Sequence, residues 1–267
     1  MTKVIVAGAA GRMGRRIIDM VIRSEEVDLA GAFEHPDSPA VGEDAGRIAG
    51  AGEAGVTIAA SLKDIIDSGD VVIDFTSPQA TLENIRAISR GGLAVVIGTT
   101  GISGNILAEV RALAKGMRCV LAPNMSIGMN VMFKIAGQMA GILGDDFDIE
   151  VLEAHHRHKK DAPSGTALRL GQILAGSVNR DLDKVAVYER KGIIGERTDQ
   201  EIGMQTLRAG DITGDHMVMF AGSGERLELI HRAHSRDNFA GGAVKAAAWI
   251  VKQPVGIYDM QDVLGLK

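Results

Sequence analysis

The sequence VIVAGAAGRMG at residues 4–14 decides the fold of the N-terminal part of the chain. Val4–Ala7 is a short apolar run, which predicts a buried strand. Three glycines follow it: Gly8, Gly11 and Gly14. Apolar residues then recur at helical spacing from Ile17 to Ile22. A strand, a glycine-rich turn and a helix in this order are typical of the unit that binds the phosphates of a dinucleotide.

Each part of this unit has a physical task. Gly8 allows the chain to turn sharply, Gly11 allows the backbone to approach a pyrophosphate, and Gly14 allows the helix to pack closely on the strand. The spacing is GxxGxxG, so the usual GxGxxG pattern is matched only loosely. A second expected strand, Val27–Phe33, ends beside Glu34, at the distance where a carboxylate binds the adenosine ribose.

The residues around this unit bear on the choice of cofactor. The charge of Glu34 would repel a 2′-phosphate, which favours NAD over NADP, and His35 could partly offset that repulsion when protonated. Arg12 stands at the start of the helix, where it could contact a phosphate or simply be solvated.

The alternation of strands and helices continues to residue 122 and predicts an α/β fold with a doubly wound parallel sheet. Strands are expected at Val56–Ala59, Val71–Phe75, Ala94–Ile97 and Cys119–Ala122. Helices are expected at Leu62–Ile66, Thr81–Arg90 and Ile106–Ala114.

Ligands of such sheets bind beyond the carboxyl ends of the strands. Three segments of small and hydroxyl-bearing residues fall there: Phe75-Thr76, Gly98-Thr99-Thr100 and Ala122-Pro123-Asn124-Met125. They suit the nicotinamide half of a dinucleotide, although ordinary turn chemistry also explains each of them.

The second half of the chain has a different pattern. After a long helix at Ser126–Leu143, strand-like runs follow one another with few helices between them, which predicts an α+β domain with an open mixed sheet. These runs are Phe147–Ala154, Val185–Tyr188, Ile202–Leu207, His216–Phe220 and Leu227–His231. Gly222-Ser223-Gly224 predicts a hairpin between the last two. The open face of such a sheet is expected to pack against other subunits.

The sequence EAHHRHKKDAPSGT, Glu153–Thr166, concentrates the chemistry. Ser164 is a natural helix N-cap, so the amides of Gly165 and Thr166 would attract an anion. His155 and Lys159 are four residues apart and would share one side of the segment. A proton carrier, an ammonium and an anion site together suit a small carboxylate-bearing substrate, whereas the alternative is a solvated basic loop.

Composition excludes several classes of function. The formal net charge is −5 and aromatic residues are only 3%, so no nucleic-acid partner is expected. Cys119, the single cysteine, lies in an apolar run and is expected to be a buried thiol. No signal peptide or membrane span is expected, which predicts a cytoplasmic protein. The adjacent histidines do not have metal-ligand spacing, so no metal is expected.

Taken together, five segments closely resemble the dihydrodipicolinate reductase family. They are the glycine turn, Asp74-Phe75-Thr76, Gly98–Gly101, Ala122–Ser126 and Glu153–Thr166. The resemblance implies reduction of a cyclic dicarboxylate, 4-hydroxy-tetrahydrodipicolinate, by NADH or NADPH on the route to diaminopimelate and lysine. It implies a homotetramer built from the second-domain sheets. It also implies a C-terminal helix that returns to the first domain, so the expected domains are 1–126 with 237–267, and 127–236.

The resemblance also implies roles for individual residues. His155 and Lys159 would be catalytic, His155 as the proton donor or acceptor and Lys159 as a proton donor. The substrate carboxylate would be bound by His156, Gly165 and Thr166. The cofactor would be bound by Gly8, Ala9, Ala10, Gly11, Arg12, Met13, Glu34, His35, Gly98, Thr99, Thr100, Ala122, Pro123, Asn124 and Met125. Because His35 stands where many members have arginine, NADH is expected to be preferred and NADPH to be usable.

Two other functions remain open at this point. One is an aspartate-dehydrogenase-like oxidoreductase on the same scaffold, which would ignore the cyclic dicarboxylate. The other is a non-catalytic protein that senses NAD(H), which would bind NADH without consuming it.

Overall fold

A computed structural model describes residues 1–267 and divides them into two compact units. Unit 1 contains Met1–Ile127 and Arg236–Lys267, and unit 2 contains Gly128–Ser235. No helix has both the length and the apolar character that crossing a bilayer requires.

Unit 1 is built on a seven-stranded sheet in the order β12-β6-β5-β4-β1-β2-β3, with every neighbouring pair parallel. The strands are β1 (Thr2–Ala7), β2 (Val27–Phe33), β3 (Ile58–Ala59), β4 (Val71–Asp74), β5 (Ala94–Ile97), β6 (Arg118–Leu121) and β12 (Gly256–Tyr258). The predicted parallel sheet is therefore confirmed.

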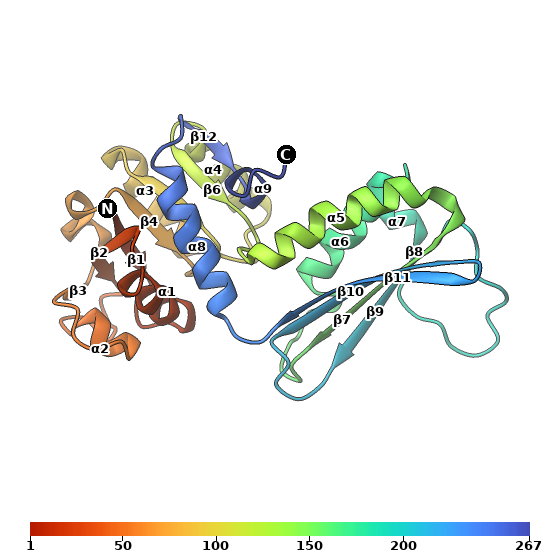
Figure 1. The fold of residues 1–267 in the computed structure, drawn as a ribbon. Coiled ribbons are helices and arrows are strands. Elements are labelled where there is room, and N and C mark those ends of the chain that lie inside the picture. The colour runs from red at the N-terminus through yellow and green to blue at the C-terminus, as the bar shows by residue number, and fades with distance from the viewer. The chain divides into compact units, whose positions relative to one another are not determined.

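Helices cover both faces of this sheet. They are α1 (Arg12–Ile22), α2 (Ala45–Ala49), α3 (Pro78–Gly91), α4 (Gly104–Ala114), α8 (Asp237–Ile250) and α9 (Met260–Val263). Val4 and Val6 of β1 belong to one apolar core and Ile5 and Ala7 to another, as alternation along a strand requires. Helices α1 and α8 pack side by side in the first of these cores (Figure 1).

Unit 2 contains a five-stranded sheet in the order β11-β10-β7-β9-β8. The strands are β7 (Asp148–His155), β8 (Ala186–Val187), β9 (Ile202–Arg208), β10 (Gly214–Gly222) and β11 (Glu225–Ala233). Strand β10 is antiparallel to β7 and β11, whereas β9 is parallel to β7 and β8. The predicted open mixed sheet and the hairpin at Ser223-Gly224 are confirmed.

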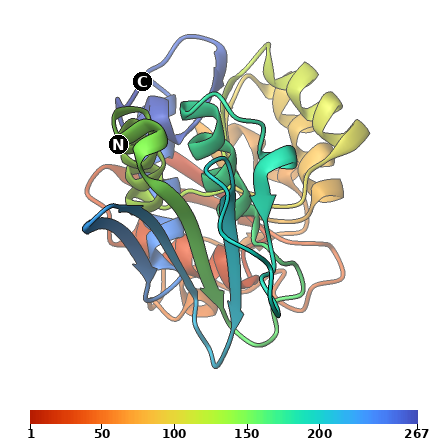
Figure 2. The ribbon, with the colours of Figure 1, turned by 90° about the vertical axis from the view of Figure 1, so that its right-hand side faces the viewer.

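The helices of unit 2 are α5 (Ile127–Leu143), α6 (Gly165–Ser177) and the short α7 (Leu182–Val185). Helices α5 and α6 share an apolar core with one face of the sheet, which includes Val151 of β7 and Val218 of β10. Figure 2 shows the strands of this unit side by side with the helices on one side of them. The opposite face of the sheet carries no helix.

Two expectations about secondary structure were wrong. Leu62–Ile66 is not an α-helix but part of two 3₁₀ helices, η1 (Leu62–Asp64) and η2 (Ile66–Ser68), because the backbone of Ile65 leaves the helical region with φ −131°. Val185–Tyr188 is not one strand, because α7 extends to Val185 and leaves only Ala186–Val187 for β8.

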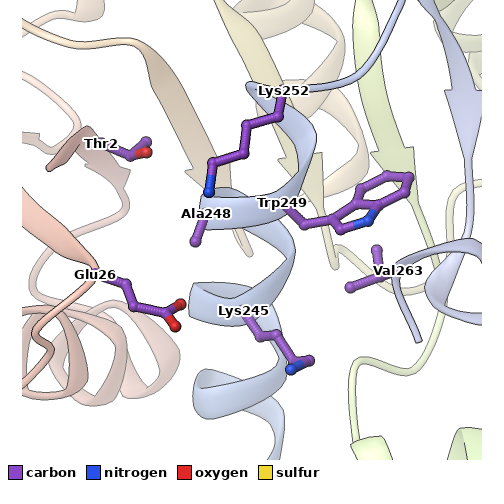
Figure 3. A pocket seen from close by; sticks show the side chains of 7 residues that line it. All are labelled: Thr2, Glu26, Lys245, Ala248, Trp249, Lys252 and Val263. Carbon is purple, nitrogen blue, oxygen red and sulfur yellow. The ribbon is translucent and has the colours of Figure 1, made fainter. Parts of the chain in front are cut away.

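A surface depression of about 350 Å³ lies in unit 1 (Figure 3). It is lined by Thr2, Glu26, Lys245, Ala248, Trp249, Lys252 and Val263. None of the residues predicted to bind cofactor or substrate lines it.

Candidate active site

The glycine turn of unit 1 has the geometry that a phosphate-binding turn needs. Gly8 has a positive φ of +65°, and a side chain at Gly14 would place its Cβ 2.0 Å from the Gly8 carbonyl oxygen. Glycine is therefore required at both positions. Helix α1 begins directly after Gly11, and no side chain caps it.

The hydrogen bonds of this turn show which amides remain for an anion. The amide of Ala9 donates to Phe33, that of Ala10 to Glu34, and that of Gly11 to Gly8. The amides of Arg12 and Met13 in the first turn of α1 have no acceptor in the protein. These two amides and the helix dipole fit a pyrophosphate, so the turn fits a dinucleotide.

Glu34 is fixed beside the turn, immediately after β2. Its Oε1 accepts the amide of Ala10 at 3.0 Å and its Oε2 accepts the amide of His35 at 2.9 Å. The carboxylate therefore lies against the glycine turn, which fits a ribose-binding role. The exposed His35 ring lies 3.6 Å from a carboxylate oxygen of Asp37.

Buried Asp74 organises the carboxyl end of β4 through hydrogen bonds that the motif Asp74-Phe75-Thr76 does not by itself reveal. Its Oδ1 accepts from the amide of Thr76 at 2.9 Å and from the hydroxyl of Thr99 at 3.3 Å, and its Oδ2 accepts from Asn84 at 2.9 Å. Thr99, which follows β5, is thus buried and hydrogen-bonded to the end of β4, whereas Thr100 is exposed. A Cβ on Gly98 would lie 2.2 Å from the ring of Phe75, so that loop also requires glycine.

The last predicted cofactor segment, Ala122–Met125, follows β6. The amide of Ala122 donates to Ile97 at 3.2 Å, which places the segment beside the Gly98 loop. Asn124 accepts the amide of Ser126 through Oδ1 at 2.9 Å, Met125 is buried, and Pro123 is exposed. The structure therefore brings the predicted cofactor residues together at one edge of the unit 1 sheet.

In unit 2, the inward face of β7 changes from apolar to ionisable along its length. Ile149 and Val151 belong to the apolar core, and Glu153 and His155 continue the same face. The neighbouring strands carry polar residues in register: Thr206 of β9 and His216 of β10 both lie opposite Glu153. Arg208 lies opposite His155.

Glu153 is the centre of this cluster and is completely buried. It accepts hydrogen bonds from Nδ1 of His155 at 2.5 Å, from both terminal nitrogens of Arg208 at 2.9 Å, from the amide of Ser164 at 3.0 Å and from the hydroxyl of Thr206 at 3.2 Å. Burial alone would raise the pKa of Glu153, but the bonds from His155, Arg208 and Ser164 outweigh burial and lower it to about 2.

His216 packs its ring against His155 in an edge-to-face contact, with 5.2 Å between centroids. Burial, and then the charge of His155, lower the pKa of His216 to about 3. Its Nε2 lies 3.3 Å from the hydroxyl of Ser164. His216 is therefore a neutral ring between the histidine and the start of α6.

The start of α6 forms as predicted. Ser164 is the N-cap, and its hydroxyl accepts the amide of Ala167 at 3.1 Å. The first intrahelical bond runs from Leu168 to Ser164, so the amides of Gly165 and Thr166 precede it. This end of the helix can hold a carboxylate.

His156 and Lys159 lie in the turn after β7. The strand ends at His155, and the amide of Lys159 donates to the carbonyl of His156 at 3.0 Å. The ammonium of Lys159 pairs with Asp161 at 2.9 Å, and its charge also contributes to the lowered pKa of His216.

The single cysteine lies in the core of unit 1. Cys119 is fully buried, so the predicted buried thiol is confirmed, and burial raises its pKa to about 12. The structure contains no group of three or more His, Cys, Asp or Glu side chains that could hold a metal ion.

Two family models cover most of the chain. "Dihydrodipicolinate reductase, N-terminus" matches residues 2–125, and "Dihydrodipicolinate reductase, C-terminus" matches residues 128–264. A 4-hydroxy-tetrahydrodipicolinate reductase of Desulfotalea psychrophila is 58% identical over 267 residues, covering 100% of this chain and 99% of that protein. One from Syntrophus aciditrophicus is 53% identical and covers 100% of both chains.

Solved structures support the fold. A dipicolinate-bound dihydrodipicolinate reductase from Paenisporosarcina sp. TG-14 aligns with a TM-score of 0.75 at 24% identity, over 97% of each chain. A scyllo-inositol dehydrogenase from Lactobacillus casei, with NAD(H) and scyllo-inositol bound, aligns with a TM-score of 0.61 at 16% identity, over 100% of this chain and 94% of that one. From both family models and the full-length relatives, the chain belongs to the dihydrodipicolinate reductase family.

Proposed function

We propose how this chain carries out the reaction of its family, the NAD(P)H-dependent reduction of 4-hydroxy-tetrahydrodipicolinate on the route to diaminopimelate and lysine. The substrate loses its hydroxyl as water to give a conjugated ring. NADH or NADPH, when bound, would supply the hydride for the reduction of this ring at C4. The protein must hold two carboxylates and move protons, and the polar cluster of unit 2 contains groups for both tasks.

His155 carries the proton, and Lys159 is the second donor. The observation that supports this most strongly is the 2.5 Å bond between Glu153 and Nδ1 of His155, because it leaves Nε2 of the ring for the substrate. The same buried carboxylate accepts the amide of Ser164. The proton carrier is thereby connected to the helix start whose amides suit an anion.

The substrate carboxylate is bound by His156, Gly165 and Thr166. The amides at the start of α6 and the helix dipole favour a negative charge there. Lys159 adds a positive charge in the turn after β7, which also contains His156. A dianionic ring therefore meets a partly positive surface, which lowers the cost of removing its carboxylates from water.

The cofactor is bound in unit 1, with NADH preferred and NADPH usable. The residues that bind it are Gly8–Met13, Glu34, His35, Gly98–Thr100 and Ala122–Met125. Glu34 supports this preference because its carboxylate is fixed at the turn and would repel a 2′-phosphate. His35 offers only a titratable positive charge there. Residues 1–126 and 237–267 act as the cofactor domain, and residues 127–236 as the domain for substrate binding and oligomerisation.

The protein works as a homotetramer in the cytoplasm. The face of the unit 2 sheet opposite α5 and α6 supports oligomerisation, because Ile230, Met217 and Leu152 form an apolar row across β11, β10 and β7. Ile230 is 42% exposed in the single chain. A second copy is the natural cover for a self-complementary apolar sheet face. The single buried thiol fits a reducing compartment.

A coupled assay tests the function as a whole. Dihydrodipicolinate synthase would generate the substrate in place, and the loss of NADH absorbance would be followed. We expect consumption of NADH that depends on the synthase. Turnover of aspartate in its place would indicate an aspartate-dehydrogenase-like enzyme, and NADH binding without any turnover would indicate a sensor.

A further inference from the structure

The buried carboxylate of Glu153 has no freedom to serve as a solvated charge. The residue is 0% exposed, and all of its hydrogen-bond partners are donors from the protein. The guanidinium of Arg208 balances its charge with two bonds of 2.9 Å, one to each oxygen. The carboxylate is therefore ionised and fixed in position at neutral pH.

An ionised carboxylate can only accept hydrogen bonds, and this dictates the tautomer of His155. Nδ1, at 2.5 Å from Oε2 of Glu153, must carry a proton. In the neutral ring, Nε2 then carries the lone pair, and it can accept a proton and return it. The other ring in contact, His216, is held neutral by burial and does not compete as a second charge.

The neighbouring strand leaves room for the Nε2 edge of the ring. Gly214 of β10 lies beside it, and a Cβ added there would be 3.1 Å from Nε2 and 3.4 Å from Cδ2. No protein group hydrogen-bonds Nε2. The ring is therefore held by Nδ1 from one side, while the opposite edge faces a residue without a side chain.

We propose that Glu153 is a positioning residue of the reductase, which holds His155 as the Nδ1–H tautomer and is itself held by Arg208. Its bond to the amide of Ser164 fixes the start of α6 relative to the same ring. One carboxylate thus sets both the proton carrier and the anion-binding amides. The inference rests on the proposed role of His155 and adds the group that makes this role possible.

Glu153→Gln is the direct test, because the surrounding donors decide how the amide must lie. Oε1 of Glu153 accepts from Ser164, Thr206 and Arg208, so the amide oxygen of glutamine would occupy that position. Its NH₂ group would then face Nδ1 of His155 and force the Nε2–H tautomer. The corresponding change in serine proteases lowers kcat by about 10⁴-fold.

We expect Glu153→Gln to lower kcat at least about 100-fold while KM changes less than about threefold, since the substrate-binding amides remain. Nitrogen NMR of the histidine rings would show the protonated nitrogen of His155 move from Nδ1 to Nε2. Glu153→Asp, which keeps the charge, should retain the Nδ1–H tautomer and recover part of kcat. If Glu153 had only a structural role, the kcat of the two variants would not depend on the tautomer of His155.

Glu150→Gln is the matched control. Glu150 lies on the same strand and also pairs with arginines, Arg190 and Arg197, but its side chain does not contact His155. Its kcat should stay within about twofold of the parent enzyme. Normal kcat in Glu153→Gln with an unchanged tautomer would overturn the proposal.

The tautomer of His155 in the unmodified enzyme provides a test that needs no folded variant of Glu153. An Nε2–H ring in that enzyme would overturn the positioning role. An Nδ1–H ring together with full activity of His155→Ala would instead overturn the proposed role of His155 and leave the geometry intact. The two failures are therefore distinguishable.

Discussion

Gly242 in helix α8 lies directly against the backbone of Met125. A Cβ added to Gly242 would be 1.8 Å from the Met125 carbonyl oxygen and 2.9 Å from its carbonyl carbon, so no other residue fits without movement. Met125 ends the segment that follows β6, for which we propose a cofactor-binding role. Helix α8 thereby sets the position of a loop more than a hundred residues earlier in the chain.

Gly242→Ala should both destabilise the protein and weaken cofactor binding. Overpacking of this kind costs about 1–3 kcal/mol, because helix α8 or the Met125 segment must shift. We expect a lower midpoint in urea unfolding and a higher KM for NADH. Gly241→Ala is the control, since its Cβ would meet nothing within 4 Å. Equal behaviour of the two variants would show that the close contact has no consequence.

Replacing His35 by arginine should shift the cofactor preference toward NADPH. A guanidinium at this position carries a permanent charge and can pair with a 2′-phosphate, whereas an imidazole can do so only in its protonated form. We expect the ratio of kcat/KM for NADPH to that for NADH to rise at least about fivefold. His35→Gln, whose side chain cannot be protonated, should not raise this ratio. A parent enzyme that already favours NADPH tenfold would contradict the proposed preference.

The stability of the protein should fall in mild acid because of His216. Its folded-state pKa is lowered from 6.5 to about 3, so between these values the unfolded chain binds one more proton than the folded chain. The contribution of neutral His216 to the free energy of unfolding is complete above pH 6.5. It is lost as the pH falls toward 3, at about 1.4 kcal/mol per pH unit at most. The lowered pKa of Glu153 adds a further loss between about 4.5 and 2.

Thermal unfolding at pH 7 and pH 5 checks this linkage. His216→Gln should show a smaller difference in Tm between the two pH values than the parent protein. His158→Gln, at an exposed position in the turn after β7, should behave like the parent. If His216→Gln retains the full pH dependence, the buried neutral histidine is not its source.

A charge on the open sheet face should break the proposed tetramer. Ile230→Asp would bury an unpaired carboxylate at the subunit contact, which strongly disfavours association. Light scattering after size-exclusion chromatography should then give a smaller mass. Ile142→Asp is the control, because Ile142 is 83% exposed and belongs to α5, on the other face of the sheet. A parent protein that runs as a monomer would refute the tetramer.

The local parts of the fold could be predicted because the sequence encodes them locally. The strand Ala94–Ile97 has the predicted bounds, and Ser164 caps its helix as predicted. The pattern of Leu62–Ile66 predicts an α-helix where the structure has two 3₁₀ helices, because five residues of mixed polarity do not distinguish two 3₁₀ turns from one α-helical turn.

The inner arrangement of the site could be predicted only in part. The alternation of Ile149, Val151, Glu153 and His155 is visible in the sequence and would have placed Glu153 on the buried face. Arg208 and His216 could not be found in the same way, because their contacts with Glu153 depend on the register of β9 and β10 against β7. Register across non-adjacent segments is a tertiary property, which neither spacing nor residue type reveals.

The most direct test of the account is the turnover number of His155→Ala in the coupled assay with NADH. Removal of a proton carrier typically lowers the rate by about 10²–10⁴-fold. We predict a kcat lowered at least about 100-fold with NADH binding unchanged, since the residues that we propose bind the cofactor belong to unit 1. A His155→Ala enzyme with near-normal kcat would contradict the central claim.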